Sequence, residues 1–233
     1  MSDNTTDFFN APELYLLAAA FEGEVLLGLP EKEIYQLLGE EVFEEANNRL
    51  IAKGILTKEG RLTKGGALII KALESYHQSR KYVRINNLMF AFFEEEHKDE
   101  LVMLSEIEKG EKYKLFIIAK SKVLKLLIDH FPIIGREPDE AEKEFRKHTL
   151  THQERHEVDA YQPDHIMNME VFDGSLILKS ESTRDTHQQW LVFEREEKLI
   201  MVETQEKKYY HASQYFFMKM LFDELEFPYQ EVK

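Results

Sequence analysis

The sequence predicts an α+β protein, in which an antiparallel sheet of two strand-strand-strand-helix halves, with helices on one face, follows a winged-helix-like N-terminal unit. Three observations support this fold class. Amphipathic helical patterns with glycine stops fill the first 80 residues. Apolar runs separated by charged turns begin at Lys81, and the order of these runs is repeated near the end of the chain.

The N-terminal unit, residues 1–80, is predicted to contain four helices and one small hairpin. Apolar residues recur every three or four positions in each helical pattern, and glycines mark the helix ends. The helical patterns are "APELYLLAAAFEG", "LPEKEIYQLLG", "EEVFEEANNRLIAKG" and "KGGALIIKALESYHQS". In the second of them, Ile34, Leu37 and Leu38 are expected to face the core. The hairpin "ILTKEGRLT" precedes the fourth helix, and this order of elements is typical of a winged-helix unit.

Two halves of similar order follow, residues 81–134 and residues 165–233. The first half has the strand patterns "YVRINNLMFAFFE", "ELVMLSEIE" and "KYKLFIIAK" before the helix "SKVLKLLIDHFP". The second has "GSLILKSES", "QQWLVFERE" and "KLIMVETQE" before "SQYFFMKMLFDELEFP". Either these patterns record an internal duplication, or short apolar helices resemble each other by chance. A duplication would most simply join both sets of strands into one sheet, in one compact domain.

The segment between the halves, residues 135–164, is the most polar part of the chain. We predict a linker or an interaction arm there. Its middle, from Pro138 to about His156, is predicted as a helix that is polar nearly all round, and such a helix bridges solvent, docks on a partner or is mobile.

Composition limits the class of protein. The chain has 233 residues, of which 44 are acidic and 30 basic, so its net charge is -14. It contains no cysteine, which excludes disulfides, thiolate zinc sites and cysteine nucleophiles. The acidic start "MSDNTTDFFNAPE" does not look like a signal peptide, and no apolar run reaches the ~18 residues of a membrane span. We therefore expect a cytoplasmic protein without membrane insertion.

No motif indicates catalysis, a cofactor or a metal. Nucleophile-elbow, phosphate-loop and dinucleotide-binding patterns are absent from the sequence. His148, His152 and His156 recur at four-residue spacing, but Glu154 does not stand where a zincin motif places its base. We predict a non-enzyme without metal or cofactor; a hydrolase of unknown type is a minor alternative.

A winged-helix transcriptional regulator that binds DNA is the main alternative function. The helix that would enter the major groove offers Asn47, Asn48 and Arg49, and the hairpin is basic. Acidic residues crowd the N-terminal half of that helix, where it would meet phosphates: Glu40, Glu41, Glu44 and Glu45. We therefore expect no nucleic acid partner.

The patterns "ELYLLAAA" and "RLIAKGIL", with their short motifs "ExxxLA" and "L-x-x-K/R-G", together with the two halves, resemble the EspG family. These are cytosolic chaperones of type VII (ESX) secretion systems. The chain is also similar to uncharacterised proteins of type VII secretion loci in Gram-positive bacteria. The resemblance implies a central antiparallel sheet with a quasi-two-fold repeat, no catalytic residues or cofactor, and a helical exported protein as partner, whose apolar tip the chaperone keeps soluble. No binding residue can be aligned with the family.

Aromatic and methionine side chains on the predicted strands are the candidate protein-binding residues, because interfaces are rich in them. They are Met89, Phe90, Phe92, Phe93, Trp190 and Phe193. Alternation along a strand places about half on each face of the sheet. The alternative is that all of them belong to the core. Trp190, flanked by two glutamines, is expected to be partly exposed.

Overall fold

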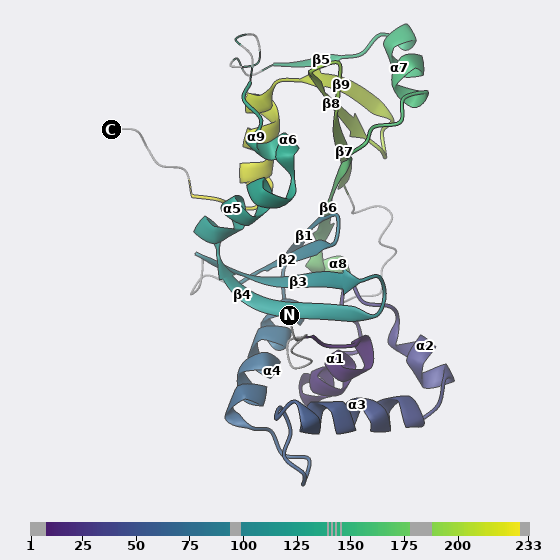
Figure 1. The fold of residues 1–233 in the computed structure, drawn as a ribbon, viewed down its shortest axis with the longest axis vertical. Helices are drawn as coiled ribbons and strands as arrows, with labels where there is room; N and C mark the ends of the chain where they lie inside the picture. The colour runs from purple at the N-terminus through teal and green to yellow at the C-terminus, as the bar shows by residue number, and fades with distance from the viewer. Residues whose placement is uncertain are drawn as a thin grey trace. The chain divides into compact units, whose positions relative to one another are not determined.

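The computed structural model of the chain describes residues 8–93, 99–138, 140, 142, 144, 146–177 and 188–228 (Figure 1). Nine strands form one sheet in the order β4-β3-β2-β1-β6-β7-β8-β9-β5. Their bounds are β1 Lys81–Ile85, β2 Leu88–Phe92, β3 Glu100–Glu108, β4 Lys112–Ala119, β5 Lys147–Thr149, β6 Met167–Asp173, β7 Gln188–Arg195, β8 Lys198–Glu203 and β9 Lys208–Ala212. The pairs β2–β3, β6–β7, β7–β8, β8–β9 and β5–β9 are antiparallel. The predicted α+β class with a large antiparallel sheet is confirmed.

Nine α-helices lie in the described residues: α1 Ala11–Ala18, α2 Lys32–Leu37, α3 Glu41–Ala52, α4 Lys64–His77, α5 Lys120–His130, α6 Pro132–Gly135, α7 His152–Asp159, α8 Gly174–Ile177 and α9 Gln214–Glu224. None of the helices in this described part is long and apolar enough to cross a membrane. The chain divides into two compact units. Unit 1 consists of residues 1–82, 87–118 and 173–183, and unit 2 consists of residues 83–86, 119–172 and 184–233. The four segments expected from the sequence, 1–80, 81–134, 135–164 and 165–233, stay a prediction.

Unit 1 has a helical layer of α1, α3 and α4 whose core is aliphatic and aromatic. Leu14, Leu50, Leu73 and Tyr76 are all at most 1% exposed. α4 begins where the Thr63 hydroxyl accepts a hydrogen bond from the Gly66 N–H, at 3.1 Å. The hairpin before it is reduced to a single bridge between Leu56 and Leu62. A winged-helix unit is therefore not established.

Two predictions for the first 93 residues are wrong. The stretch "YVRINNLMFAFFE" forms two strands, β1 and β2, because Asn86 turns the chain with φ = 51°, a left-handed conformation that asparagine tolerates. The apolar residues of α2 face solvent, since none of the residues of this helix is buried.

Unit 2 has helices on both faces of strands β7–β9, with α6 and α9 on one face and α7 on the other (Figure 1). The prediction of helices on one face is wrong here. Val158 of α7 and Leu150 form a buried cluster with Phe193, Ile200 and Val202 of the sheet. The polar segment is thus not free, because its apolar residues cover this face.

The predicted long helix from Pro138 to His156 is also wrong. β5 pairs with β9 within that stretch, so that Lys147 lies opposite Ala212. α7 begins only at His152, because Thr151 caps it and accepts a hydrogen bond from the Glu154 N–H. Strands β6 and β9 have no counterpart in the sequence prediction. The predicted strand "GSLILKSES" begins with the short helix α8, and residues 178–187 lie outside the described residues.

Candidate protein-binding groove

Helix α9 is apolar on two faces. Phe217, Leu221 and the C-cap residue Leu225 are fully buried in the core of unit 2. A second set, Tyr215, Met218 and Phe222, follows at positions i, i+3 and i+7 and lies on a different side of the helix. Tyr215 is 55% exposed. A surface helix needs only one apolar stripe to pack on its sheet, so a second stripe is unusual. Met218 and Phe222 are half-buried, and the Phe222 ring packs against Phe227 with centroids 5.1 Å apart.

The second stripe is one wall of a groove. Its other wall is α6 and the residues that follow it, and the groove has a volume of about 440 Å³. The lining residues are Ile134, Gly135, Arg136, Pro138, Gln214, Tyr215, Met218, Lys219 and Phe222. Most of these side chains are apolar at the groove, which suits the apolar side of a helix. Lys219 forms an ion pair with Asp223 one turn later.

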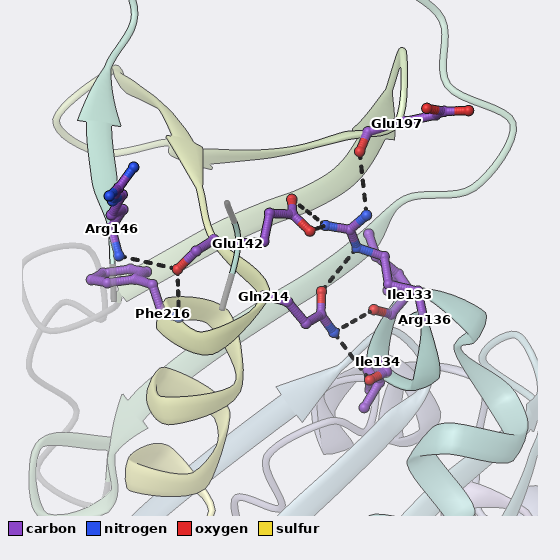
Figure 2. Close-up of polar contacts among 9 residues, drawn as sticks. Ile133, Ile134, Arg136, Glu142, Arg146, Glu197, Gln214 and Phe216 are labelled. Atoms are coloured by element: carbon purple, nitrogen blue, oxygen red, sulfur yellow. Dashed lines mark hydrogen bonds and ion pairs between the residues drawn. The ribbon is translucent and has the colours of Figure 1, made fainter. Parts of the chain in front are cut away.

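A buried amide ties the two walls together (Figure 2). The Gln214 Nε2 donates hydrogen bonds to the carbonyl oxygens of Ile133 and Ile134, at 3.0 and 3.1 Å, and its Oε1 accepts one from Arg136 Nε at 2.9 Å. Gln214 is only 4% exposed. A buried amide with its donors and acceptor paired fixes a geometry, because any displacement leaves a polar atom unpaired. α6 and the start of α9 are therefore held at one separation.

Arg136 extends this network. Its Nη2 donates to both carboxylate oxygens of Glu142, and its Nη1 donates to the Glu197 carbonyl oxygen at 3.3 Å, as Figure 2 shows. The side chains of Arg136 and Glu142 are 15% and 8% exposed. The guanidinium thus donates its hydrogen bonds to acceptors of the protein itself. We assign it a structural role at the groove rather than an anion-binding role.

The first turn of α9 is fixed by a cap. The Ser213 hydroxyl accepts hydrogen bonds from the N–H groups of Phe216 and Arg146, both at 3.1 Å. The Ser213 N–H in turn donates to the Arg146 carbonyl oxygen at 2.9 Å. Tyr215 therefore projects from a rigid helix start, which lowers the entropy lost when a partner binds.

The residues predicted to bind a partner are mostly buried. Trp190 and Phe193 are 8% and 5% exposed, so the expected partial exposure of Trp190 is wrong. Lys147 of the edge strand β5 covers the indole, with its Nζ 5.9 Å from the ring centroid, and Tyr210 packs beside it at 6.1 Å. Phe193 lies on the other face, where Val158 covers it.

The candidates of unit 1 lie on or beside β2. Met89, Phe90 and Phe92 are at most 3% exposed, and Phe93 is partly exposed. Met89 and Phe90 alternate across the strand, so both faces of β2 are covered. Whether any of the six residues takes part in binding stays a prediction.

The sequence did contain a signal for the groove. The pattern "SQYFFMKMLFDELEFP" has more apolar positions than the buried stripe of one helix uses. The sequence predicted only a helix there, because a sequence does not show which apolar face lacks a neighbour.

The histidines that the structure describes lie on several separate elements. His148 lies on β5 opposite His211, while His152 and His156 of α7 lie edge to face with ring centroids 4.5 Å apart. Burial, followed by the nearby Lys198, lowers the pKa of His211. Within the described residues, no group of three His, Asp or Glu side chains is placed to hold a metal ion.

A second cavity of about 550 Å³ lies in the same unit and is lined by polar and apolar side chains in mixture. His130, His165, Asp164 and Glu194 line it, and all four are exposed. No arrangement of a nucleophile with an oriented base occurs among these lining residues, so the cavity does not indicate a reaction class.

Comparison with known proteins finds a family, a related secretion protein and a solved structure with a similar fold. The family described as "Domain of unknown function (DUF5081)" matches residues 3–233. The type VII secretion system protein EsaE of Staphylococcus aureus, from strains USA300 and NCTC 8325, is 28% identical over 141 residues, which are 60% of this chain and 58% of EsaE. The similarity therefore spans about three fifths of the length of EsaE.

The solved fold is that of the Mycobacterium tuberculosis type VII secretion system chaperone EspG5, in a complex with the PE25–PPE41 dimer. It matches with a TM-score of 0.54 at 9% identity, over 96% of this chain and 97% of EspG5. At this identity the likeness concerns the fold alone. The resemblance to the EspG family and to type VII secretion proteins that the sequence predicted is confirmed.

Proposed function

The chain belongs to the DUF5081 family, and from this premise we propose that it is a non-catalytic cytosolic chaperone of a type VII-like secretion system, which binds a helical exported protein. The observation that supports it most is the EspG5-like fold over almost the whole chain, together with the similarity to EsaE. EspG5 was solved with a bound protein dimer, so a fold of this kind can serve as a protein-binding scaffold.

We assign the binding to the groove between α6 and α9, in place of the buried aromatic set. Tyr215, Met218 and Phe222 present an apolar stripe at helical spacing on a rigid wall. A partner helix with apolar residues at i, i+3 and i+7 can pack along such a stripe, as in other helix-in-groove complexes. Covering the stripe would protect the partner's own apolar side from water until it is exported.

The test is co-purification and calorimetry with a small helical protein encoded beside this gene in a type VII secretion locus. Tyr215→Ala should weaken binding roughly 30-fold, since truncation of a central aromatic anchor costs ~2 kcal/mol or more. The melting temperature should hardly change, because Tyr215 is 55% exposed.

Leu68→Ala is the matched control, since Leu68 is 70% exposed on α4 of unit 1. This variant should bind like the unchanged protein. Equal affinity of Tyr215→Ala and Leu68→Ala would reject the groove as the binding surface. No binding of any helical protein from the locus would reject the chaperone function itself.

A further inference from the structure

Helix α2 of unit 1 exposes an apolar stripe that a core helix would bury. Ile34, Leu37 and Leu38 are 49%, 88% and 67% exposed. Each residue advances about 100° around a helix, so these three side chains share an arc of about 100°. Single exposed leucines are ordinary on protein surfaces, but three neighbours on one helix side make a patch that marks an interaction site.

The orientation of α2 is fixed by the tyrosine next to this stripe. Tyr35 lies against Tyr15, with ring centroids 6.4 Å apart. The Tyr15 hydroxyl donates a hydrogen bond to the Pro30 carbonyl oxygen at 2.8 Å, directly before the helix. Leu38 keeps a helical conformation as the C-cap residue. These contacts hold the tyrosine side of α2 inward, so the apolar stripe stays in solvent.

Carboxylates flank the stripe along the chain. Between residues 31 and 45 the sequence has one base, Lys32, and six acids: Glu31, Glu33, Glu40, Glu41, Glu44 and Glu45. All six acids are exposed. Two of these acids act on the nearby Tyr15: burial first, then Tyr35, Glu33 and Glu31 raise its pKa to about 12. We call Ile34, Leu37, Leu38 and these six acids the α2 patch.

The negative charge of the α2 patch determines which kind of partner can bind there. A second copy of this chain would bring the same carboxylates, and the net charge of -14 opposes self-association. We propose that the α2 patch docks a basic amphipathic helix of another protein. Its apolar side would cover the leucines, and its lysines or arginines would reach the carboxylate rim. The residues of the α2 patch belong to unit 1, and those of the α6–α9 groove belong to unit 2. The proposal for the α2 patch therefore does not rest on the proposed function of the groove.

The test uses a fluorescein-labelled synthetic peptide of about five helical turns, with leucines at i, i+3, i+4 and i+7 and lysines elsewhere. Its binding to the full chain is followed by fluorescence anisotropy. A scrambled peptide of the same composition keeps the charge but loses the apolar side. We expect the amphipathic peptide to bind at least roughly 10-fold more tightly than the scrambled one, and its affinity to fall as salt is raised.

Variants separate the α2 patch from other surfaces. Leu37→Asp should reduce affinity roughly 10-fold or more without a change in melting temperature, because Leu37 is 88% exposed. The double change Glu40→Lys with Glu41→Lys should weaken binding and flatten its salt dependence. The control Glu59→Lys with Glu111→Lys makes the same charge change at exposed sites outside the patch and should bind more tightly than the Glu40/Glu41 variant.

Three results would overturn the proposal. The first is that the scrambled peptide binds as tightly as the amphipathic one. The second is that binding survives Leu37→Asp but is lost in Tyr215→Ala, which would place the peptide in the α6–α9 groove. The third is a dimer in sedimentation experiments that Leu37→Asp dissociates, because the patch would then join two copies of this chain.

Discussion

At the scale of single residues, a buried ion pair joins the two motifs that carry the family resemblance. Glu13 comes from "ELYLLA" and Lys53 from "LIAKG". Lys53 Nζ lies 2.7 and 2.8 Å from the two carboxylate oxygens of Glu13, whose side chain is fully buried. Lys53 also donates to the Phe8 carbonyl oxygen, and Glu13 accepts the Asn10 N–H at 2.7 Å. The motifs therefore serve the packing of α1 on α3.

Replacing Glu13 by Ala should lower the free energy of unfolding by ~3–5 kcal/mol, because the Lys53 ammonium is left buried without its partner. Urea denaturation followed by circular dichroism measures this loss. Glu45→Ala is the control: Glu45 is 73% exposed and pairs with Arg49, so its loss should cost less than ~1 kcal/mol. Equal costs for the two variants would contradict the structural role of the pair.

Trp190→Ala should also destabilise unit 2, by ~3–5 kcal/mol, because the indole is 8% exposed and its removal leaves a cavity. Thermal and urea denaturation measure the effect. The exposed Tyr215, changed to Ala, should leave the free energy of unfolding within ~1 kcal/mol of the unchanged protein. If Trp190→Ala is as mild as Tyr215→Ala, the indole is not part of the core.

The sequence could not predict the burial of Trp190, because the side chains that cover it come from elsewhere in the chain. The flanking glutamines suggested exposure, yet Lys147 of β5 and Tyr210 of β9 lie over the ring. The same holds for the groove. Its apolar stripe was visible in the sequence, but the opposite wall is placed by the hydrogen bonds of Gln214 with Ile133 and Ile134.

At the scale of elements, the strands with strong apolar patterns were predicted well, and the polar ones were missed. β3, β4, β7 and β8 all fall within predicted strand patterns. β6 was missed although its first five residues, Met167–Val171, alternate between apolar and polar side chains as a strand does, because this alternation is short and follows a polar segment. In the structure the polar atoms of Asn168 and Glu170 are paired with distant residues, Gln189 at 2.8 Å and Arg84. Such distant partners offset the cost of placing a polar residue in a strand, and the local sequence does not reveal them.

Helix α7 should lose protection in acid. The hydrogen bonds of the Thr151 side chain and backbone hold the pKa of the exposed Glu154 carboxyl below its usual value. A lowered folded pKa means that the stabilisation is present above the unfolded pKa and is lost as the pH falls through the folded pKa. Hydrogen exchange of the α7 amides should therefore accelerate over that acidic range.

Thr151→Val is the informative variant for α7, because it removes the hydroxyl and keeps the shape. The α7 amides should already exchange faster at neutral pH, and the acid dependence should shrink. Gln153→Ala changes a neighbouring exposed residue and should keep the acid dependence. An unchanged pH profile in Thr151→Val would show that the cap does not control α7.

At the scale of the whole molecule, the charge distribution weighs against the DNA-binding alternative. Lys58 and Arg61 of the hairpin and Lys64 at the start of α4 are exposed, but the acids of α2 and α3 belong to the same unit. We expect no duplex DNA binding at physiological salt in a gel-shift assay with mixed genomic fragments. Micromolar retention that is abolished when Lys58, Arg61 and Lys64 become Glu would contradict this expectation.

Because Trp190 is the single tryptophan of the chain, the tryptophan fluorescence of the protein comes from one position in unit 2. Lys147 lies over the rings of Trp190, Tyr210 and Phe216 at 5.9, 4.2 and 4.9 Å, so one cation connects the indole to the first turn of α9. Phe216 follows the groove residue Tyr215 directly in the chain. We therefore expect a partner that binds the groove to change the fluorescence spectrum of the unlabelled protein. The α2 patch is far from Trp190 along the chain, so the binding of a peptide there is followed through a label on the peptide.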